Sequence, residues 1–287
     1  MQEQGMRMLG YSAWNGDKRR PSRQQLFAAE CLPPPLGGTW STANDTQILK
    51  VMRERDIKRA FTPHAAFNGL VGTPKGPWVV HRLDQERQLL RSPDNEPFEG
   101  YEMAPGEVML SATGGCMLIV AVGHMPGGRM RTIFSHAGRD SLIDRGRIAG
   151  GPARRYEGVL YSIADMFEKW GIEPNHIEVH GLFPISPSVF VHPFSHPEWG
   201  SFNRTMLKDI QARWGAAAAY EVSDARMGGR GIAIDLSALL RAQADELHFF
   251  AAKGYPYLTP DGPYVTTRDR DPTIARKRNL VILRRLC

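Results

Sequence analysis

The amino-acid sequence predicts an α/β (α+β) fold, a single layered domain in which mixed β-sheets are flanked by helices. Two observations lead to this prediction. Apolar runs rich in Val, Ile and Leu, typical of buried strands, are interleaved with segments whose apolar residues recur at helical spacing, without a strict βαβ repeat. In addition, no Ser/Gly-rich linker or low-complexity tract divides the 287 residues. We therefore expect one large domain with a substantial hydrophobic core.

The N-terminal part combines an irregular segment with a helix and a short strand. Residues 1–43 are rich in Gly, Pro and polar residues, which predicts an irregular N-terminal segment, and we assign the main domain to residues 44–287. Asn44-Asp45-Thr46 offers capping side chains for a helix over residues 47–59. Residues 78–81, Trp-Val-Val-His, are typical of a short strand.

The middle of the chain places a cysteine and a histidine at the ends of predicted strands. Residues 107–122 are rich in Val, Ile, Leu and Met and are interrupted by a pair of glycines just before Cys116, which predicts one or two buried strands with a break at the cysteine. After a Gly/Pro turn, a further strand over residues 130–135 ends at His136. A hairpin or a short crossover would bring the thiol and the imidazole to one end of a sheet.

The C-terminal half continues the interleaving of helices and strands. Val159, Ile163 and Phe167 fall on one face of a helical segment that stops at Gly171. The elements predicted in this half are a helix over residues 156–170, a strand over 177–183, helices over 203–214 and 236–252, and a closing strand over 279–283.

Composition and charge narrow the classes of function. The 36 basic and 30 acidic residues give a net charge of +6, which is compatible with nucleic acid, a phosphate-bearing small molecule or simply solubility. The basic clusters at 18–23 and 268–285 lack the interleaved aromatic residues of single-strand binders, so nucleic acid is not favoured as a partner. The three cysteines show no paired spacing, no apolar stretch reaches about 18 residues, and the N-terminus is unlike a secretory signal. We expect a protein of the reducing cytoplasm without a membrane segment.

Cys116 and His136 are residue types that carry chemistry when they are paired. A thiol beside an imidazole is either a nucleophile with its base or part of a soft-metal site. His81, at the end of the predicted strand 78–81, is a third candidate, and His64 is an alternative to it. One Cys and two His with room for a fourth ligand are the makeup of an open, catalytic zinc site.

With these residues placed, the chain from about His81 to Leu283 resembles the laccase-domain family, the YfiH-like proteins first labelled polyphenol oxidases and now known as purine nucleoside phosphorylases. Gly114-Gly115-Cys116 corresponds to the family's Ala-Asp-Cys, and residues 136–141, His-Ala-Gly-Arg-Asp-Ser, to its His-Ala-Gly-Trp-Arg-Gly. Residues 267–283 follow the spacing of the family's C-terminal Ser-x-Arg-Arg-Asp…Gly-Arg…Leu-Val-x-Leu pattern. The Asp before the cysteine and the Trp-Arg after the His-Ala-Gly are not matched here.

The resemblance implies the fold shared by YfiH-like proteins and cytotoxic necrotizing factor, with Zn²⁺ held by His81, Cys116 and His136. It further implies a purine nucleoside phosphorylase in which phosphate attacks the ribose of adenosine or inosine, with adenosine deamination at the same metal. The partners would be a small-molecule nucleoside and phosphate.

Further roles in this interpretation go to four residues. Arg139 or Arg270 would grip phosphate through its guanidinium fork, and Arg270 and Phe190 would contact the substrate. Asp140 would accept a proton or hold a ligand histidine in one tautomer. Together with Cys116 and His136, Arg139 and Asp140 form the predicted catalytic set.

Two alternatives use the same scaffold differently. The Gly-Cys, strand, His arrangement also resembles chemoreceptor glutamine deamidases and the cytotoxic necrotizing factor toxins, in which Cys116 would be the nucleophile and His136 the base, and His81 would be dispensable. The unmatched Asp and Trp-Arg are compatible with a non-catalytic binding protein instead.

Overall fold

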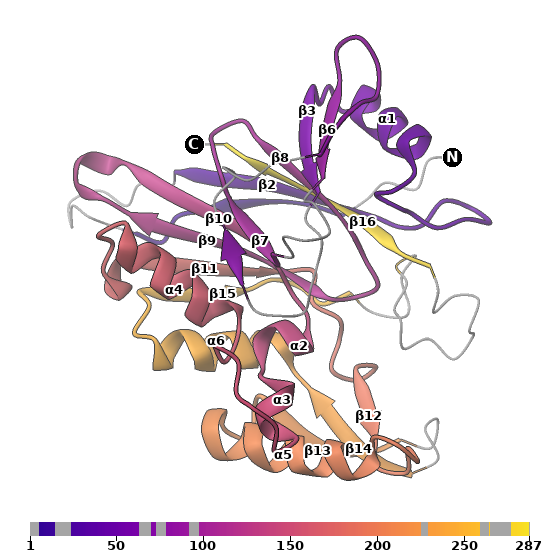
Figure 1. The fold of residues 1–287 in the computed structure, drawn as a ribbon, viewed down its shortest axis with the longest axis vertical. Helices are drawn as coiled ribbons and strands as arrows, with labels where there is room; N and C mark the ends of the chain where they lie inside the picture. Colours follow the sequence, from indigo (N-terminus) through magenta and orange to yellow (C-terminus); the bar gives the residue numbers. More distant parts are fainter. Residues whose placement is uncertain are drawn as a thin grey trace.

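The layered α/β architecture predicted from the sequence is confirmed (Figure 1). In the described part of the chain, two large β-sheets are stacked, helix α1 lies against one of them, and further helices lie between the other and a third, smaller sheet. The computed structural model describes residues 6–14, 24–62, 70–72, 79–91, 98–224, 229–258, 264 and 277–286.

A seven-stranded sheet forms the upper layer in Figure 1 and carries helix α1 (Asp45–Glu54) on its outer face. Asn44 caps α1, because its side chain accepts a hydrogen bond from the Gln47 N–H. Ile48, Val51 and Met52 pack against the sheet. The strands, in spatial order, are β1 (Met6–Tyr11), β2 (Gln25–Leu32), β16 (Asn279–Arg285), β8 (Val108–Thr113), β3 (Arg59–Thr62), β6 (Gln88–Arg91) and β5 (Val79–Arg82).

The prediction that residues 1–43 form an irregular segment is wrong for β1 and β2. Strand β2 lies between β1 and β16, antiparallel to both, and its Phe27 and Cys31 are fully buried. A run of Pro and Gly residues follows β2, where residues 35–38 form a turn. Strand pairing with the C-terminal β16 is a contact that local composition does not reveal, and it makes this segment part of the main sheet.

A six-stranded sheet lies directly beneath the first. Its central strand, β9, is buried on both faces, as expected of a strand between two layers. Leu118 and Val120 face the first sheet, whereas Ile119 and Ala121 face the helices, following the period of two of a β-strand. The strands, in spatial order, are β15 (Ala251–Gly254), β11 (Ile177–Leu182), β9 (Met117–His124), β10 (Met130–Ala137), β7 (Gly100–Met103) and β4 (Val71–Gly72).

Helices cover the other face of this sheet, and a three-stranded sheet lies below them (Figure 1). The helices are α2 (Arg139–Leu142), α3 (Arg145–Ile148), α4 (Val159–Lys169), α5 (Gly200–Trp214) and α6 (Leu236–Glu246), with single 3-10 turns at Pro126–Gly128 and Pro174–His176. The small sheet has the order β12 (Val191–Pro193), β14 (Gly229–Ile234), β13 (Ala219–Asp224).

The helix predicted over residues 236–252 is shorter than expected. Helix α6 ends at Glu246, and residues 251–254 form β15 parallel to β11. His248 has a φ of 57°, in the left-handed region, which an α-helix cannot contain. The chain therefore turns and joins the sheet.

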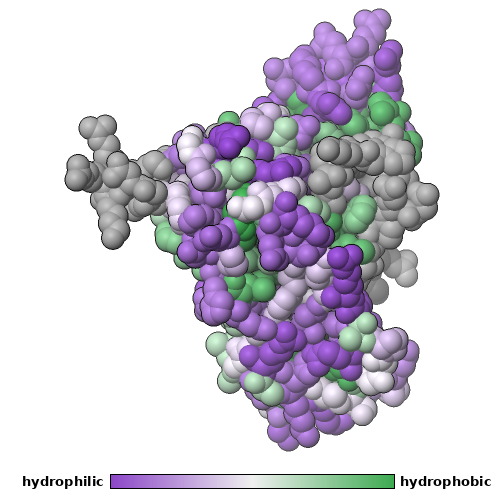
Figure 2. All heavy atoms as spheres, turned by 60° about the vertical axis from the view of Figure 1, so that its left-hand side comes forward, coloured by the Kyte–Doolittle hydropathy of each residue, from purple (hydrophilic) through white to green (hydrophobic). Residues whose placement is uncertain are grey.

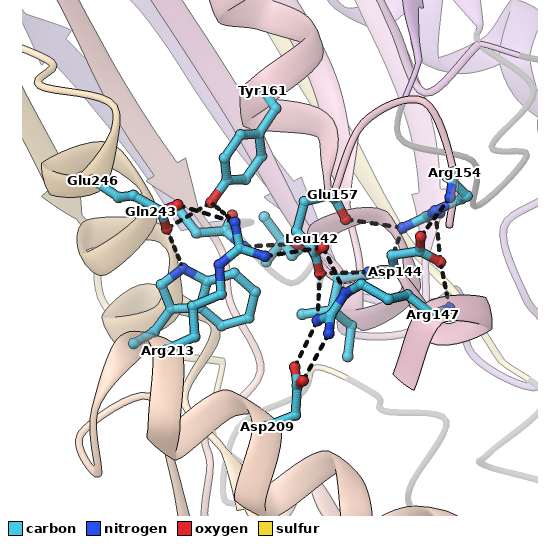
Figure 3. A network of polar contacts seen from close by, with 12 residues as sticks. Leu142, Asp144, Arg147, Arg154, Glu157, Tyr161, Asp209, Arg213, Gln243 and Glu246 are labelled. Atoms are coloured by element: carbon cyan, nitrogen blue, oxygen red, sulfur yellow. Dashed lines mark hydrogen bonds and ion pairs between the residues drawn. The ribbon is translucent and has the colours of Figure 1, made fainter. Parts of the chain in front are cut away.

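A polar network ties α3 to α5 and α5 to α6 (Figure 3). Arg147 of α3 forms a bidentate pair with Asp209 of α5, at 2.8 and 2.7 Å, and also contacts Glu157. Arg213, near the end of α5, bridges Glu157 and Glu246. Bidentate guanidinium–carboxylate pairs fix relative orientation as well as adding binding energy. The network therefore sets the position of α5 against the segment that leads from β10 into α2 and α3.

The molecular face in Figure 2 is predominantly hydrophilic, with apolar patches interrupted by polar residues. Within the described ranges, no helix has the length and apolar composition needed to cross a membrane.

Candidate functional site

The turn between β8 and β9 presents Cys116 where the chain passes from one large sheet to the other. Gly115 has a φ of +107°, a conformation that side-chain-bearing residues rarely adopt. Thr113 holds the turn, because its Oγ1 accepts from the Gly115 N–H at 3.2 Å and donates to the Cys116 carbonyl at 3.0 Å. The Ile185 N–H donates to the Gly115 carbonyl at 3.1 Å. This positive φ explains why residue 115 is a glycine, where the Ala-Asp-Cys pattern has an aspartate.

Antiparallel pairing of β9 and β10 brings His136 to this turn. His136 lies opposite Leu118 and Ala137 opposite Met117, so the end of β10 lies beside the start of β9. The His136 imidazole forms a hydrogen bond with the Cys116 thiol. The expectation that strand pairing joins these two residues is confirmed.

Gly138 leaves room for the thiol and imidazole to meet. A Cβ atom at this position would lie 3.2 Å from Cys116 Sγ and 3.0 and 3.3 Å from His136 Cε1 and Nε2. These separations are tighter than ordinary van der Waals contact, so a side chain here would push the pair apart.

Glu99 completes the arrangement from the neighbouring strand. It immediately precedes β7, directly opposite His136, and its carbonyl accepts from the His136 N–H at 2.8 Å. Its carboxylate Oε2 lies 2.8 Å from His136 Nδ1, and Ser141 Oγ lies 3.1 Å from the same nitrogen. Glu99 is fully buried and His136 is 5% exposed. Cys116, His136 and Glu99 therefore form a thiol–imidazole–carboxylate triad, the arrangement used to activate a nucleophile.

Electrostatics favour charge separation in this triad. Burial alone would raise the pKa of the Cys116 thiol, but the charge and hydrogen bond of His136 outweigh it and lower that pKa below its ordinary value. Burial opposes protonation of His136, yet the Cys116 thiolate and the Glu99 carboxylate raise the pKa of the imidazole to about 10. Both shifts favour transfer of the Cys116 proton to His136, which gives a thiolate paired with an imidazolium.

Access distinguishes Cys116 from the other described cysteine. Cys116 is partly exposed, whereas Cys31 is fully buried in β2. Burial strongly raises the pKa of the Cys31 thiol, which keeps it protonated. Reactive cysteines combine a low pKa with access to solvent, and only Cys116 of this pair does so.

The structure does not bring His81 to Cys116 and His136. His81 lies on β5, the edge strand of the seven-stranded sheet, and its Nδ1 is 3.9 Å from Asp45 Oδ2. Two strands, β3 and β6, separate β5 from β8, and each strand step is about 4.8 Å. The prediction of His81 as a ligand beside the pair is therefore corrected. His64, the alternative third ligand, lies outside the described residues.

The described residues do not complete the predicted zinc site. A catalytic zinc is held by three protein ligands. Cys116 and His136 supply two donors, but no group of three or more His, Cys, Asp and Glu side chains suited to a metal is found among the residues that the structure describes.

Asp140 does not hold the site histidine. Its carboxylate forms a bidentate pair with Arg139, at 2.6 and 2.9 Å, and lies 3.8 Å from Arg145. Burial would raise the pKa of Asp140, but Arg139, Arg145 and Arg154 hold it below its ordinary value. Asp140 is therefore a poor proton acceptor. Glu99 takes the orienting role that was predicted for Asp140, because it lies directly across the strand pair from His136.

The remaining predicted residues lie apart from the triad or outside the described part of the chain. Phe190 is 8% exposed and packs in the core, edge-on to His192 with ring centroids 4.9 Å apart. Arg139 donates to His192 Nδ1 at 3.1 Å and lines a separate pocket. Arg270 lies outside the described residues.

Sequence reasoning missed Glu99 and Ser141. The two residues are separated from His136 by 37 and 5 positions, and neither belongs to a recognisable spacing motif. A signal was present only in the composition of the segment, since Glu99 is an acidic residue flanked by Phe98, Gly100 and Tyr101. Its partner could not be named without the pairing of β7 with β10.

Comparison with solved structures identifies the fold. The Neisseria meningitidis protein NMB0706, described with the family DUF152, shares 12% sequence identity with a TM-score of 0.57, over 96% of this chain and 98% of that protein. The hypothetical protein YfiH of Bacillus licheniformis shares 11% identity with a TM-score of 0.57, over 90% and 95% of the two chains. This chain has the YfiH-like fold.

A third structure supports the same conclusion. YlmD from Geobacillus stearothermophilus shares 12% identity with a TM-score of 0.53, over 90% of this chain and 92% of its own. No protein-family model and no curated protein matches the sequence. At these identities the likeness is one of fold, and the resemblance drawn from the Cys116 and His136 motifs is confirmed at that level.

Proposed function

We propose that this YfiH-like protein is a thiol-dependent amidohydrolase that cleaves the C–N bond of a carboxamide, with Cys116 as nucleophile. The observation that carries the proposal is the triad of a partly exposed Cys116, a buried His136 and a buried Glu99. The chemistry is that of the glutamine deamidases which the Gly-Cys, strand, His pattern resembles.

The proposed reaction uses the charges that the triad already holds. The Cys116 thiolate attacks the carbonyl carbon of the amide, and a C–S bond forms as the carbonyl π electrons move to oxygen. The His136 imidazolium then donates its proton to the departing nitrogen, so the C–N bond breaks and ammonia leaves. A thioester remains on Cys116 and His136 is neutral.

Hydrolysis of the thioester returns the enzyme to its starting state. Neutral His136 takes a proton from water, and the hydroxide attacks the thioester carbon. The C–S bond breaks, a carboxylic acid is released, and the thiolate is again paired with the imidazolium. Glu99 holds the ring by its Nδ1 atom throughout, so that Nε2 faces the sulfur.

Ammonia release from primary amides tests the proposal. Purified wild-type protein and the Cys116→Ala variant are incubated with free glutamine, a glutamine-containing peptide and a denatured protein, and ammonia is measured with a coupled dehydrogenase. We expect release by the wild type that is lost in Cys116→Ala and in His136→Ala. The Cys31→Ser variant is the matched control, because Cys31 is buried away from the site and should not affect turnover.

Two results would contradict this proposal. The first is that a folded protein, whose Cys116 thiol is alkylated rapidly at neutral pH, releases no ammonia from any of the amides. The second is equal release by wild type and Cys116→Ala, which would show that the nucleophile lies elsewhere.

A second candidate is the zinc-dependent purine nucleoside phosphorylase implied by the family resemblance. One observation favours it. Metal-binding histidines usually hold a carboxylate with one ring nitrogen and bind the metal with the other. His136 contacts the buried Glu99 carboxylate through Nδ1, and the Cys116 thiol lies on the other side of the ring. The described residues supply two of the three ligands, so we assign no catalytic step to a metal.

Metal content and nucleoside turnover separate the two candidates. Stoichiometric zinc in the purified protein, lost in Cys116→Ala and His136→Ala and retained in His81→Ala, together with phosphate-dependent release of base from inosine or adenosine, would support the phosphorylase. Metal-free protein that releases ammonia from glutamine would support the amidohydrolase.

A further inference from the structure

A hollow lies on the outer face of the seven-stranded sheet, between its edge strand β1 and the C-terminal end of helix α1. Its volume is about 850 Å³, within the range of small-ligand sites, roughly 300–1,000 Å³. Among the described residues, the apolar cluster that α1 covers contains no side chain of β1. The side chains that matter for the chemistry of the hollow are Leu9, Tyr11, Ala28, Arg55, Ile282 and Arg284.

The register of three strands explains why this face is hollowed. Leu9 of β1 lies opposite Ala28 of β2, and Ala28 lies opposite Arg284 of β16. Residues paired in this way place their side chains on the same face of a sheet. The short Ala28 side chain therefore stands between two long ones and leaves a depression. In the next row, Glu30 lies opposite Ile282 and closes one end of it.

The hollow is bordered by apolar side chains that remain exposed. Leu9 is 45% exposed and Tyr11, two positions along the same strand, is 38% exposed. The Leu286 N–H donates to the Leu26 carbonyl, so the pairing of β16 with β2 continues past Arg284. Leu286, also exposed, shares the face of Arg284 because side chains alternate along a strand. Exposed apolar side chains that gather around a hollow are typical of a binding site.

Arg284 differs from the other charged residues of the hollow. Its Nη2 donates to the Arg55 carbonyl at the end of α1, at 3.2 Å, and no carboxylate of the described residues forms an ion pair with it. A guanidinium has five N–H donors, so donors of Arg284 remain available. The carboxylates that line the hollow are all in ion pairs, Glu30 with Arg7 and Arg55, Glu54 with Arg55, and Asp56 with Lys58.

We propose that this hollow binds an organic anion that combines an apolar body with a single carboxylate. The body lies over Ala28, against Leu9 and Tyr11, and the carboxylate accepts hydrogen bonds from Arg284. The fork of a guanidinium matches the two oxygens of a carboxylate. The lining contains four arginines and three carboxylates, a net positive charge of one, which complements a ligand with one negative charge.

The hollow and the triad lie at opposite ends of β8. Arg284 lies opposite Val108, at the start of this strand, whereas Asn279 lies opposite Thr113, at the end that leads to Cys116. Binding in the hollow therefore does not depend on the thiol. The Cys116→Ala variant should bind the anion as the wild type does.

Calorimetric titration with octanoate and with 2-naphthoate tests the proposal. Acetate is the reference for a carboxylate without a large apolar body, and octanol is the uncharged reference. We expect saturable binding of octanoate or 2-naphthoate, none of acetate, and binding of octanol that is at least about tenfold weaker than that of octanoate. Tighter binding of octanoate identifies an acyl chain as the body, and tighter binding of 2-naphthoate identifies an aromatic ring; both outcomes support the site.

Two results of this titration would overturn the proposal. The first is the absence of saturable binding of either large carboxylate. The second is equal affinity for octanoate and octanol, which would show that the carboxylate makes no contact of its own.

Two variants locate the binding and one controls for overall charge. Arg284→Met removes the charged donor, so octanoate should bind at least about tenfold more weakly while octanol is unaffected. Ala28→Leu fills the depression and should weaken the binding of both compounds. Arg155→Met removes an exposed arginine outside the hollow and should leave binding unchanged. Equal affinity for octanoate in Arg284→Met and Arg155→Met would refute the assignment.

Thermal unfolding of each variant is measured alongside, because Arg284 also contacts the end of α1. If Arg284→Met or Ala28→Leu unfolds, Leu9→Ser decides, since nearly half of that side chain is exposed. Leu9→Ser should weaken octanoate binding, and unchanged affinity would refute the site. Val80→Ser is its matched control, because Val80 is an exposed apolar residue on β5, at the opposite edge of the same sheet.

Discussion

Replacing Glu99 with glutamine tests whether the carboxylate sustains the thiolate–imidazolium pair. The substitution keeps the size of the side chain and a hydrogen-bond acceptor beside His136 Nδ1, but removes the negative charge that lies 2.8 Å from that nitrogen. Glu99 attracts the imidazolium and repels the thiolate. Because the carboxylate contacts the ring directly and the sulfur lies on the far side of it, attraction exceeds repulsion.

The expected magnitude follows from these two opposing interactions. A pair of unit charges about 4 Å apart interacts by about 4 kcal/mol at an effective dielectric constant of 20, and the energy falls in inverse proportion to distance. The repulsion of the more distant sulfur cancels about half of the attraction, which leaves a net effect of about 2 kcal/mol, consistent with hydrogen bonds to charged groups. The equilibrium between the thiolate–imidazolium pair and the neutral thiol–imidazole pair should therefore shift toward the neutral pair by about 30-fold in Glu99→Gln.

The rate of alkylation by iodoacetamide as a function of pH measures this change. The wild type should react through its thiolate well below the pH at which ordinary thiols do, because His136 lowers the Cys116 pKa. In Glu99→Gln the alkylation rate near neutral pH should fall, because a smaller fraction of Cys116 is then held as thiolate. The measurement is made in a protein that carries both Cys31→Ser and Cys287→Ser. Cys116 is then the thiol whose alkylation is measured. An unchanged profile in Glu99→Gln would refute the proposed role of the carboxylate.

Three further outcomes are expected. Gly138→Ala should slow alkylation of Cys116 and reduce any turnover while circular dichroism stays native, because its Cβ would lie 3.2 Å from Sγ; wild-type reactivity would contradict the packing described here. Gly115→Ala should lower the free energy of unfolding in a denaturant titration by about 1–2 kcal/mol, since φ is +107° there, and an unaltered midpoint would be inconsistent with that geometry. Glu178 is 1% exposed and lies 2.9 Å from His124, and the contacts that ionise it hold its pKa well below the ordinary 4.5. Its contribution to stability is therefore complete above about pH 4.5 and is lost as the pH falls below that value, so Glu178→Gln should flatten the acid side of the stability profile measured by thermal unfolding; an unchanged acid limb would show that Glu178 is not responsible.

Much of the fold could be predicted from local patterns. Helices α4 and α5 and the strands around Cys116 and His136 lie within a few residues of their predicted positions, because helical spacing and apolar runs are properties of short windows. Helix α1 is also present, but it ends at Glu54, before the predicted end at residue 59. The β1–β2 hairpin and β15 were missed, since their strand identity depends on partners distant in the chain. Pairing of β2 with the C-terminal β16 leaves no local signal.

The sequence by itself determined that a thiol and an imidazole lie at the ends of successive strands, and the structure shows that β9 and β10 pair as an antiparallel hairpin. Only the tertiary structure decided what surrounds them. Glu99 reaches His136 through a neighbouring strand that precedes it by 37 residues, and His81 is separated from the pair by the strand order of the large sheet. Strand order and register depend on the packing of the whole core. The same packing therefore determines which side chain lies beside the buried carboxylate of Glu99.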